Sequence, residues 1–196
     1  MRWTETTEQM PRPALRLVDG GLDTTVEWSW FCGFCAAPAP GNMPPPPSGR
    51  VCSSCGLGML LETRADAVPT DRDAFVVVDS RLLIQALSRD AQRLLAVTEE
   101  DAIDTPVSEL LMPADAETAS RTGFAAAIAE AAQGLEPETT RSFVRPWNTF
   151  GVRMRAKIAM CGPPRAALIV LDDDRPPGPR ATGLRSTKVV PLRAIR

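Results

Sequence analysis

Two Cys-x-x-Cys pairs constrain the fold of this chain more than any other feature of its sequence. The pairs are Cys32/Cys35 and Cys52/Cys55, and sixteen residues separate them. This spacing lies within the range of zinc sites, because each short turn directs two thiolates toward one metal ion. With four protein ligands the ion has no open position for water. The sequence therefore predicts one structural Zn²⁺ held by these four side chains.

Two other roles for paired cysteines fit the sequence less well. A disulfide framework requires export, and the N-terminal stretch MRWTETTEQMPRPALRLVDGG lacks the apolar segment of a secretory signal. A thioredoxin-like site has one such pair beside a βαβ pattern, which is absent here. No apolar run reaches the 18 residues of a membrane-spanning helix. We therefore expect a cytoplasmic protein without membrane contact, with reduced cysteines.

The region 26–62 resembles a zinc ribbon, on the basis of its two cysteine pairs. VEWSWF (26–31) would be the strand that enters the first metal-binding turn, and GMLLET (58–63) the strand that leaves the second. The loop APAPGNMPPPPSG between them is too rich in proline to pair as a strand. Trp28, Trp30 and Phe34 surround the first turn. They either cover a metal site that has no core of its own or contact a partner.

The absence of histidine excludes several kinds of chemistry. Histidine-ligated haem, a Ser-His-Asp triad and zinc sites containing histidine all require that residue. No nucleophile and base are paired in the sequence, and no open metal site is expected, so we predict that the chain is not an enzyme.

Charge is distributed unevenly along the chain. The formal net charge is −2, and residues 175–196 contain six basic and no acidic residues, so residues 1–174 carry −2 − 6 = −8. We expect a flexible basic tail over 174–196, able to contact the acidic body or an anionic partner. Its segment KVVPLRAI (188–195) is apolar enough to add as a strand or to dock in a groove.

The sequence pattern of region 73–173 predicts strands at both ends and helices between them. Two strands within 73–88 turn at Asp79-Ser80-Arg81, and a helix over 89–97 is capped by Ser88. A short helical turn over 98–104, a helical segment that starts at Pro106 and a longer helix over 116–134 follow. Strands are expected over 140–150, 151–161 and 164–174, and the last is apolar throughout, as in a central strand.

This order of elements resembles a PAS domain. The resemblance covers about 71–173 and depends on the stretches FVVVDSRLLIQALS, SRDAQRLL and TPVSELL. The chain has Ala96 and Asp104 where PAS sequences commonly have glycine. The resemblance implies a five-stranded antiparallel sheet with helices on one face. Together, the resemblances to a zinc ribbon and to a PAS domain imply that the chain belongs to the α+β fold class.

Such domains bind small ligands between sheet and helices, or serve in dimerisation and docking. The helical region 89–135 has no cysteine, so a light-sensing flavin domain with a reactive cysteine is excluded. Cys161 at a strand end is expected to be an inert thiol. An unidentified small ligand in the core and a filled core both remain open alternatives. The ligand or interface candidates are Phe124, Ile128, Trp147, Asn148, Met154 and Ile158.

These observations divide the chain into an N-terminal extension (1–25), a four-cysteine zinc ribbon (26–62), a linker (63–72), a PAS-like domain (73–173) and a flexible basic tail (174–196). We expect a signalling or regulatory protein that acts through protein partners and forms a homodimer through the PAS-like domain. The alternative is a factor in transcription regulation whose ribbon contacts RNA polymerase or nucleic acid. The ribbon is not basic, so its charge gives little support to nucleic-acid binding.

Overall fold

The computed structural model describes residues 26–40, 44–114, 123–135, 138–147, 149 and 151–173. The predicted N-terminal extension and basic tail lie outside these residues, as does Asn148. No helix in the described part is both long and apolar enough to cross a membrane.

The chain alternates short strands with a few helices. The strands are β1 (Trp28–Cys32), β2 (Leu60–Arg64), β3 (Ala74–Val78), β4 (Ile84–Leu87), β5 (Leu111–Pro113), β6 (Thr140–Pro146), β7 (Met154–Gly162) and β8 (Ala166–Asp173). The helices are α1 (Arg89–Leu95), α2 (Glu99–Ala102) and α3 (Phe124–Gln133), with 3-10 turns at Pro47–Gly49, Ala65–Ala67 and Val107–Glu109.

Two predicted helix starts are confirmed by their caps. The Ser88 side chain accepts a hydrogen bond from the Ala91 N–H and begins α1. The Thr98 side chain accepts one from the Asp101 N–H and begins α2. In each case a side-chain oxygen satisfies an N–H that has no partner within the helix.

Two predicted helical segments are shorter than expected. Gly123 is extended, with φ −60° and ψ 158°, and serves as the N-cap, so α3 begins at Phe124 instead of at residue 116. Residues 115–122 lie outside the described part. After Pro106 the chain makes one 3-10 turn, and Leu111 then begins a strand because it pairs with Pro146 of β6.

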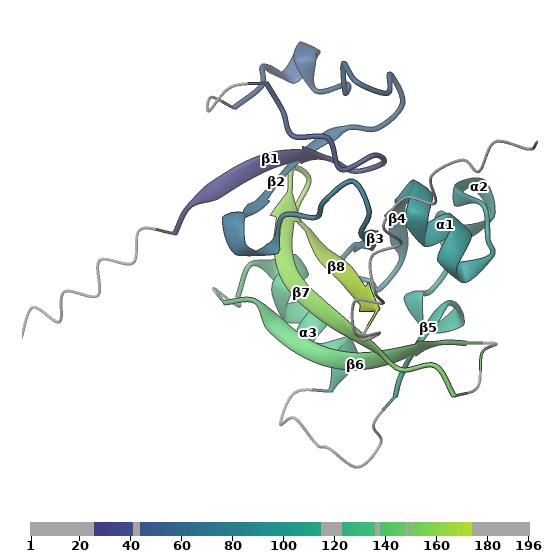
Figure 1. The fold of residues 1–196 in the computed structure, drawn as a ribbon. Coiled ribbons are helices and arrows are strands. Elements are labelled where there is room, and N and C mark those ends of the chain that lie inside the picture. Colours follow the sequence, from purple (N-terminus) through teal and green to yellow (C-terminus); the bar gives the residue numbers. More distant parts are fainter. Residues whose placement is uncertain are drawn as a thin grey trace, which may run out of the picture.

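All strand pairs are antiparallel and join one curled sheet of eight strands. The order across its centre is β7-β8-β3-β4. The strand β7 has two neighbours along its other edge, because β6 pairs with Met154–Ile158 and β2 pairs with Cys161 and Gly162. The resemblance implied five strands. The sheet is larger because β5 pairs with β6 and the hairpin β1–β2 joins the end of β7. Figure 1 shows this hairpin across the upper end of β7.

The central strands bury side chains on both faces of the sheet. In β3, Val76 belongs to the core under the helices, whereas Phe75 and Val77 belong to a second core on the opposite face. In β8, Ile169 and Leu168 divide in the same way. The prediction of a central strand at 164–174 is confirmed, since β8 pairs with β3 and β7.

Different elements cover these two faces. The helix face is covered by α1, α2 and α3, and α3 contributes buried Ala127, Ile128 and Ala131. Figure 1 shows α3 behind β7, and α1 and α2 beside β4. The opposite face, called the ribbon face below, is covered by Phe31 and Ala36 of the cysteine-containing segment.

Candidate metal centre

The structure brings together the four cysteines that the sequence singled out. Their Sγ atoms all lie within 4.8 Å of one another. The Cys32–Cys55 and Cys35–Cys52 pairs are 3.7 and 3.9 Å apart. Four sulfurs bound tetrahedrally at about 2.3 Å from one ion lie about 3.8 Å apart. A disulfide requires about 2.05 Å. The cluster therefore has the dimensions of a four-thiolate metal site.

Each ligand turn has the same backbone geometry. The N–H of Ala36 donates to the carbonyl of Cys32 at 3.0 Å, and the N–H of Gly56 donates to the carbonyl of Cys52 at 2.9 Å. The residue after each second cysteine adopts positive φ, 59° at Ala36 and 69° at Gly56. Glycine adopts this conformation without strain, and alanine does not. The sequence indicated the regular second turn through Gly56 and the less regular first turn through Ala36.

Gly58 is a requirement of the site that the sequence reasoning missed. A Cβ at this position would collide with Cys32 Sγ and would lie 2.7 Å from Phe34 Cβ. The Gly58 N–H also donates to Cys55 Sγ at 3.5 Å. The available signal was a second glycine only three residues after Cys55. Gly58 lets the two turns approach closely enough to share one ion.

Electrostatics at the cluster favour a bound cation. Cys32 is buried, and burial raises its pKa well above the usual thiol range despite opposing hydrogen bonds from backbone N–H groups. Burial also raises the pKa of Cys35. At Cys55 burial raises the pKa, but the N–H groups of Gly58 and Leu57 and the neighbouring thiols outweigh it, and its pKa falls to about 6. Burial thus disfavours the thiolate forms of Cys32 and Cys35, and a bound cation would offset the charge of four thiolates at this place.

Hydrogen bonds and packing attach this cluster to the sheet. The buried Thr63 of β2 donates its hydroxyl hydrogen to the Met160 carbonyl of β7 at 2.7 Å. Phe31 is fully buried and meets Phe75 of β3 edge to face, with ring centroids 5.7 Å apart. The segment is therefore continuous with the sheet and its ribbon-face core.

The first ligand turn also contacts α1. The Arg89 N–H donates to the Phe34 carbonyl at 3.1 Å, and the Arg89 guanidinium lies 5.6 Å from the centre of the Phe34 ring. Arg89 is the first residue of α1, directly after its Ser88 cap. A change at this turn therefore reaches the start of a helix on the other side of the sheet.

The three aromatic candidates for partner contact have different surroundings. Trp30 and Phe34 are half-buried and pack around Cys32, Cys52 and Leu60. Trp28 at the start of β1 is 44% exposed. Trp30 and Phe34 therefore cover the cluster, and Trp28 has the larger exposed surface. A role in partner contact stays a prediction for all three.

The six ligand or interface candidates are not gathered in one place. Ile128, Met154 and Ile158 are at most 1% exposed and belong to the helix-face core. Phe124, at 8%, and Trp147, at 56%, line a hollow between the β3–β4 turn, β5 and the start of α3. Cys161 is 2% exposed, and burial raises its pKa to about 12, so it fits an inert thiol.

The comparison with solved structures found partial likenesses to this chain. A PAS domain from Colwellia psychrerythraea has 20% identity and a TM-score of 0.39, over 52% of this chain and 85% of that one. The PAS domain of nitrogen regulation protein NR(II) from Vibrio parahaemolyticus has 13% identity and a TM-score of 0.35, over 52% and 88%. The E. coli DhaR(N)–DhaL complex has 14% identity and a TM-score of 0.34, over 52% and 31%. No protein-family model and no curated protein matches the sequence.

Proposed function

We propose that the four cysteines hold one structural Zn²⁺ and that 26–62 is a zinc ribbon. Four thiolates in a tetrahedron suit zinc or iron. Zinc has no redox chemistry and no preferred distortion, which suits a site whose role is to join two turns. The sulfur spacings of 3.7 and 3.9 Å support this proposal. The ion would supply no chemistry beyond holding these ligands together.

We further propose that the chain is a regulatory protein with a PAS-like sensor or docking domain. The observation that carries this proposal is the direct attachment of the ribbon to the sheet, through β2 on β7 and Phe31 on Phe75. A ligand or partner that alters the packing of the sheet would change how the ribbon is seated. The ribbon would then present a different surface to its own partner. A homodimer through the PAS-like domain belongs to the same proposal.

Native mass spectrometry of the protein purified from its own host is the experiment that tests this function. We expect one zinc per chain, together with a retained organic molecule or a second protein subunit. One iron per chain would contradict the assignment of zinc. A metal-free chain whose mass is lower by the hydrogens lost when two disulfides form would contradict the ribbon. A monomer with zinc and no ligand, from cells in every growth condition tested, would contradict the sensor and docking role.

Hydrogen exchange tests whether metal and sheet are coupled. Metal would be removed with a thiol-reactive mercurial and a chelator, and restored with Zn²⁺ after the mercurial is reversed. We expect lost protection in β2, in the last residues of β7 and at the start of α1, with α3 unchanged. Loss confined to 26–59 would show that the ribbon opens without affecting the sheet, and the regulatory proposal would fail.

The alternative role in nucleic-acid contact gains no support from Arg50 of the ribbon or from Arg64 just after it. Arg64 pairs with Asp66 at 2.9 Å, and the Arg50 guanidinium lies 6.0 Å from the centre of the Trp30 ring. Arg64 therefore has an ion-pair partner within the chain, and Arg50 lies beside the Trp30 ring, with its buried Nε atom making no hydrogen bond in the described part. Salt-dependent binding of the full chain to RNA or DNA would favour this alternative.

A further inference from the structure

A groove of about 570 Å³ lies between the ribbon and the sheet. Leu57 and Met59 of the second ligand turn form one wall, and Pro163 and Pro164 of the β7–β8 turn form another. Val77 of β3 is part of its floor. The volume falls within the range of sites that enclose a drug-sized ligand. The groove lies on the ribbon face, and Glu99 at the start of α2 also lines it.

The groove exposes large apolar side chains that have no cover in the described part of the chain. Leu57 is 73% exposed and Met59 is 52% exposed. Both stand beside a metal-binding turn whose backbone is held by hydrogen bonds, such as that from the Cys52 N–H to the Gly58 carbonyl at 2.8 Å. Apolar side chains gathered on a rigid turn next to a hollow are typical of a binding surface.

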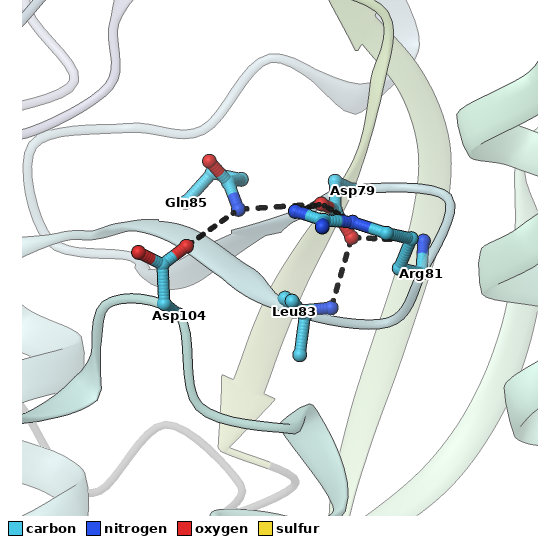
Figure 2. A network of polar contacts seen from close by, with 5 residues as sticks. All are labelled: Asp79, Arg81, Leu83, Gln85 and Asp104. Atoms are coloured by element: carbon cyan, nitrogen blue, oxygen red, sulfur yellow. Dashed lines mark hydrogen bonds and ion pairs between the residues drawn. The ribbon is translucent and has the colours of Figure 1, made fainter.

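One side of the groove is acidic. Asp79, Gln85 and Glu99 line this side, whereas the cation Arg165 lines the groove beside Pro163 and Pro164 of the β7–β8 turn. The Gln85 amide nitrogen donates to Asp79 at 3.4 Å and to Asp104 at 3.5 Å, so it holds two carboxylates near each other (Figure 2). Arg81 pairs with Asp79 at 3.0 Å and offsets part of this charge. The groove therefore favours an apolar chain segment that carries positive charge.

We propose that the chain's own C-terminal segment 188–195 occupies this groove. Its sequence, KVVPLRAI, combines four large apolar side chains with two basic ones, and the whole stretch 175–196 has six basic and no acidic residues. The charges and the apolar content of the segment thus match the two sides of the groove. The inference rests on the proposed metal-held ribbon, because the second ligand turn forms one wall.

The length of the intervening chain allows this contact. β8 begins at Ala166, which lines the groove, and ends at Asp173. An eight-residue strand is about 26 Å long. The fourteen residues from 174 to 187 span at most about 46–50 Å when extended, so the segment can return along β8 to the groove. A linker of this kind gives an effective concentration of about a millimolar, so a weak contact suffices. A partner that uses the groove would have to displace the segment.

Site-specific photocrosslinking in the full-length, metal-loaded protein tests the proposal. Leu192 is replaced by the photoreactive p-benzoylphenylalanine, and crosslinked peptides are mapped by mass spectrometry. A second protein carries the same probe at Thr182, outside the proposed segment. We expect the Leu192 probe to crosslink within one chain to the residues of the groove. The Thr182 probe should give at least about tenfold less groove product, because it lacks the apolar contacts.

Two ribbon variants form a matched pair for this test. Leu57→Asp places a charge in the groove and should lower the Leu192 groove product about tenfold. Val51→Asp is the control, since Val51 is also exposed, at 59%, on the same turn but does not line the groove. It should leave the yield unchanged.

The zinc content of every sample separates the two proposals. If Leu57→Asp loses zinc as well as the groove product, the substitution has disrupted the ribbon itself. The variant Met59→Asp then takes its place in the test. Crosslinks scattered over the surface, or none, in zinc-loaded protein would overturn the docking proposal and leave the ribbon intact. Crosslinks between two chains would also overturn it, in favour of a second copy of the chain as the occupant.

Discussion

The two faces of the sheet are closed in different ways. On the helix face, α1, α2 and α3 supply a large apolar core whose members include Ile128 and Ile158, both fully buried. On the ribbon face, a smaller core is covered by Phe31 and Ala36, which stand beside Cys32 and Cys35. The first cover is stabilised by packing and by hydrogen bonds, such as those from the Phe75 N–H to the Ser88 hydroxyl and from the Leu87 N–H to Glu99. The second depends on four ligand side chains that must stay together.

This difference separates two kinds of stability within one sheet. Helix-face packing should persist whatever ion is present, whereas ribbon-face packing should follow the metal. Because β3 and β8 contribute to both cores, loss of the metal should uncover one side of strands that stay folded on the other. Four predictions test this contrast, in order of decreasing effect.

The largest effect is expected from Gly58→Ala. The new Cβ collides with Cys32 Sγ, so the metal affinity should fall by at least about a hundredfold, at the upper end of losses from disturbed metal surroundings. Competition with a chromophoric chelator measures this change. Gly56→Ala is the control, because a Cβ there meets nothing within 4 Å and incurs only the strain of φ +69°, about 1–2 kcal/mol. Equal affinities in the two variants would contradict the role of Gly58 in bringing the two turns together.

Phe31→Ala and Ile158→Ala should separate the two faces. Removing a buried Phe costs about 3–5 kcal/mol and removing a buried Ile about 2–5 kcal/mol. Both should lower the free energy of unfolding of the metal-loaded protein, measured by urea titration. After metal removal, the effect of Phe31→Ala should nearly vanish, and that of Ile158→Ala should remain. A full effect of Phe31→Ala in the metal-free protein would show that the ribbon stays packed without the ion.

A smaller effect is expected from Thr63→Val, which removes the buried 2.7 Å hydrogen bond between β2 and β7. The cost should be about 1 kcal/mol, and metal affinity should fall with it because the ribbon loses part of its attachment. Thr105→Val is the matched control, since the Thr105 hydroxyl donates to the Ala102 carbonyl at 2.7 Å beside α2. It should lower thermal stability without changing metal affinity. A parallel loss of metal affinity in both variants would argue against separate faces.

The smallest effect is expected from Asp66→Asn, directly after β2. The Asp66 carboxylate accepts hydrogen bonds from Arg64 at 2.9 Å and from Thr139 at 3.0 Å, before β6. The Arg64 hydrogen bond lowers the pKa of Asp66, and partial burial opposes it. The stabilisation is therefore complete above the ordinary Asp pKa of about 3.9 and is lost as the pH falls through the lowered value. Because Asp66 is 53% exposed, its carboxylate should contribute less than about 1 kcal/mol to the free energy of unfolding.

Urea midpoints of the wild-type protein and Asp66→Asn, compared at each pH from neutral to acid, measure this contribution. The difference between the two proteins should be small at neutral pH and should disappear at the acid end. A wild-type protein that is less stable than Asp66→Asn at neutral pH would mean that the carboxylate destabilises the fold.

Local signals in the sequence predicted many of the elements. Ser88 and Thr98 mark helix starts through side-chain caps that involve only the next few residues. The gathering of the four cysteines was predictable because each pair forms its own turn and the spacing between the pairs is typical of a shared metal site. The start of α3 was placed too early because the polar stretch AETASRT was read as part of the helix, whereas the extended Gly123 is the N-cap of α3.

The pairing of β2 with β7 could not be predicted from periodicity, because it joins residues about a hundred positions apart. One signal did exist. The run AFVVV is buried at every position of β3. A sheet covered by helices on one face only should expose every second residue. The apolar residues at alternate positions, Phe75 and Val77, therefore indicated that another part of the chain covers the second face.

The shared edge of β7 also bears on modularity. A metal-binding segment can be regarded as a cassette that moves between proteins, but here the cysteine-containing segment completes the sheet through the pairing of β2 with β7. A shortened protein that begins after Arg64 would leave the edge of β7 at Cys161 and Gly162 without its β2 neighbour and would uncover Phe75. Open edges beside apolar surface promote self-association. We expect the shortened protein to be poorly soluble, and the unit suited to transplantation to extend from β1 to β8.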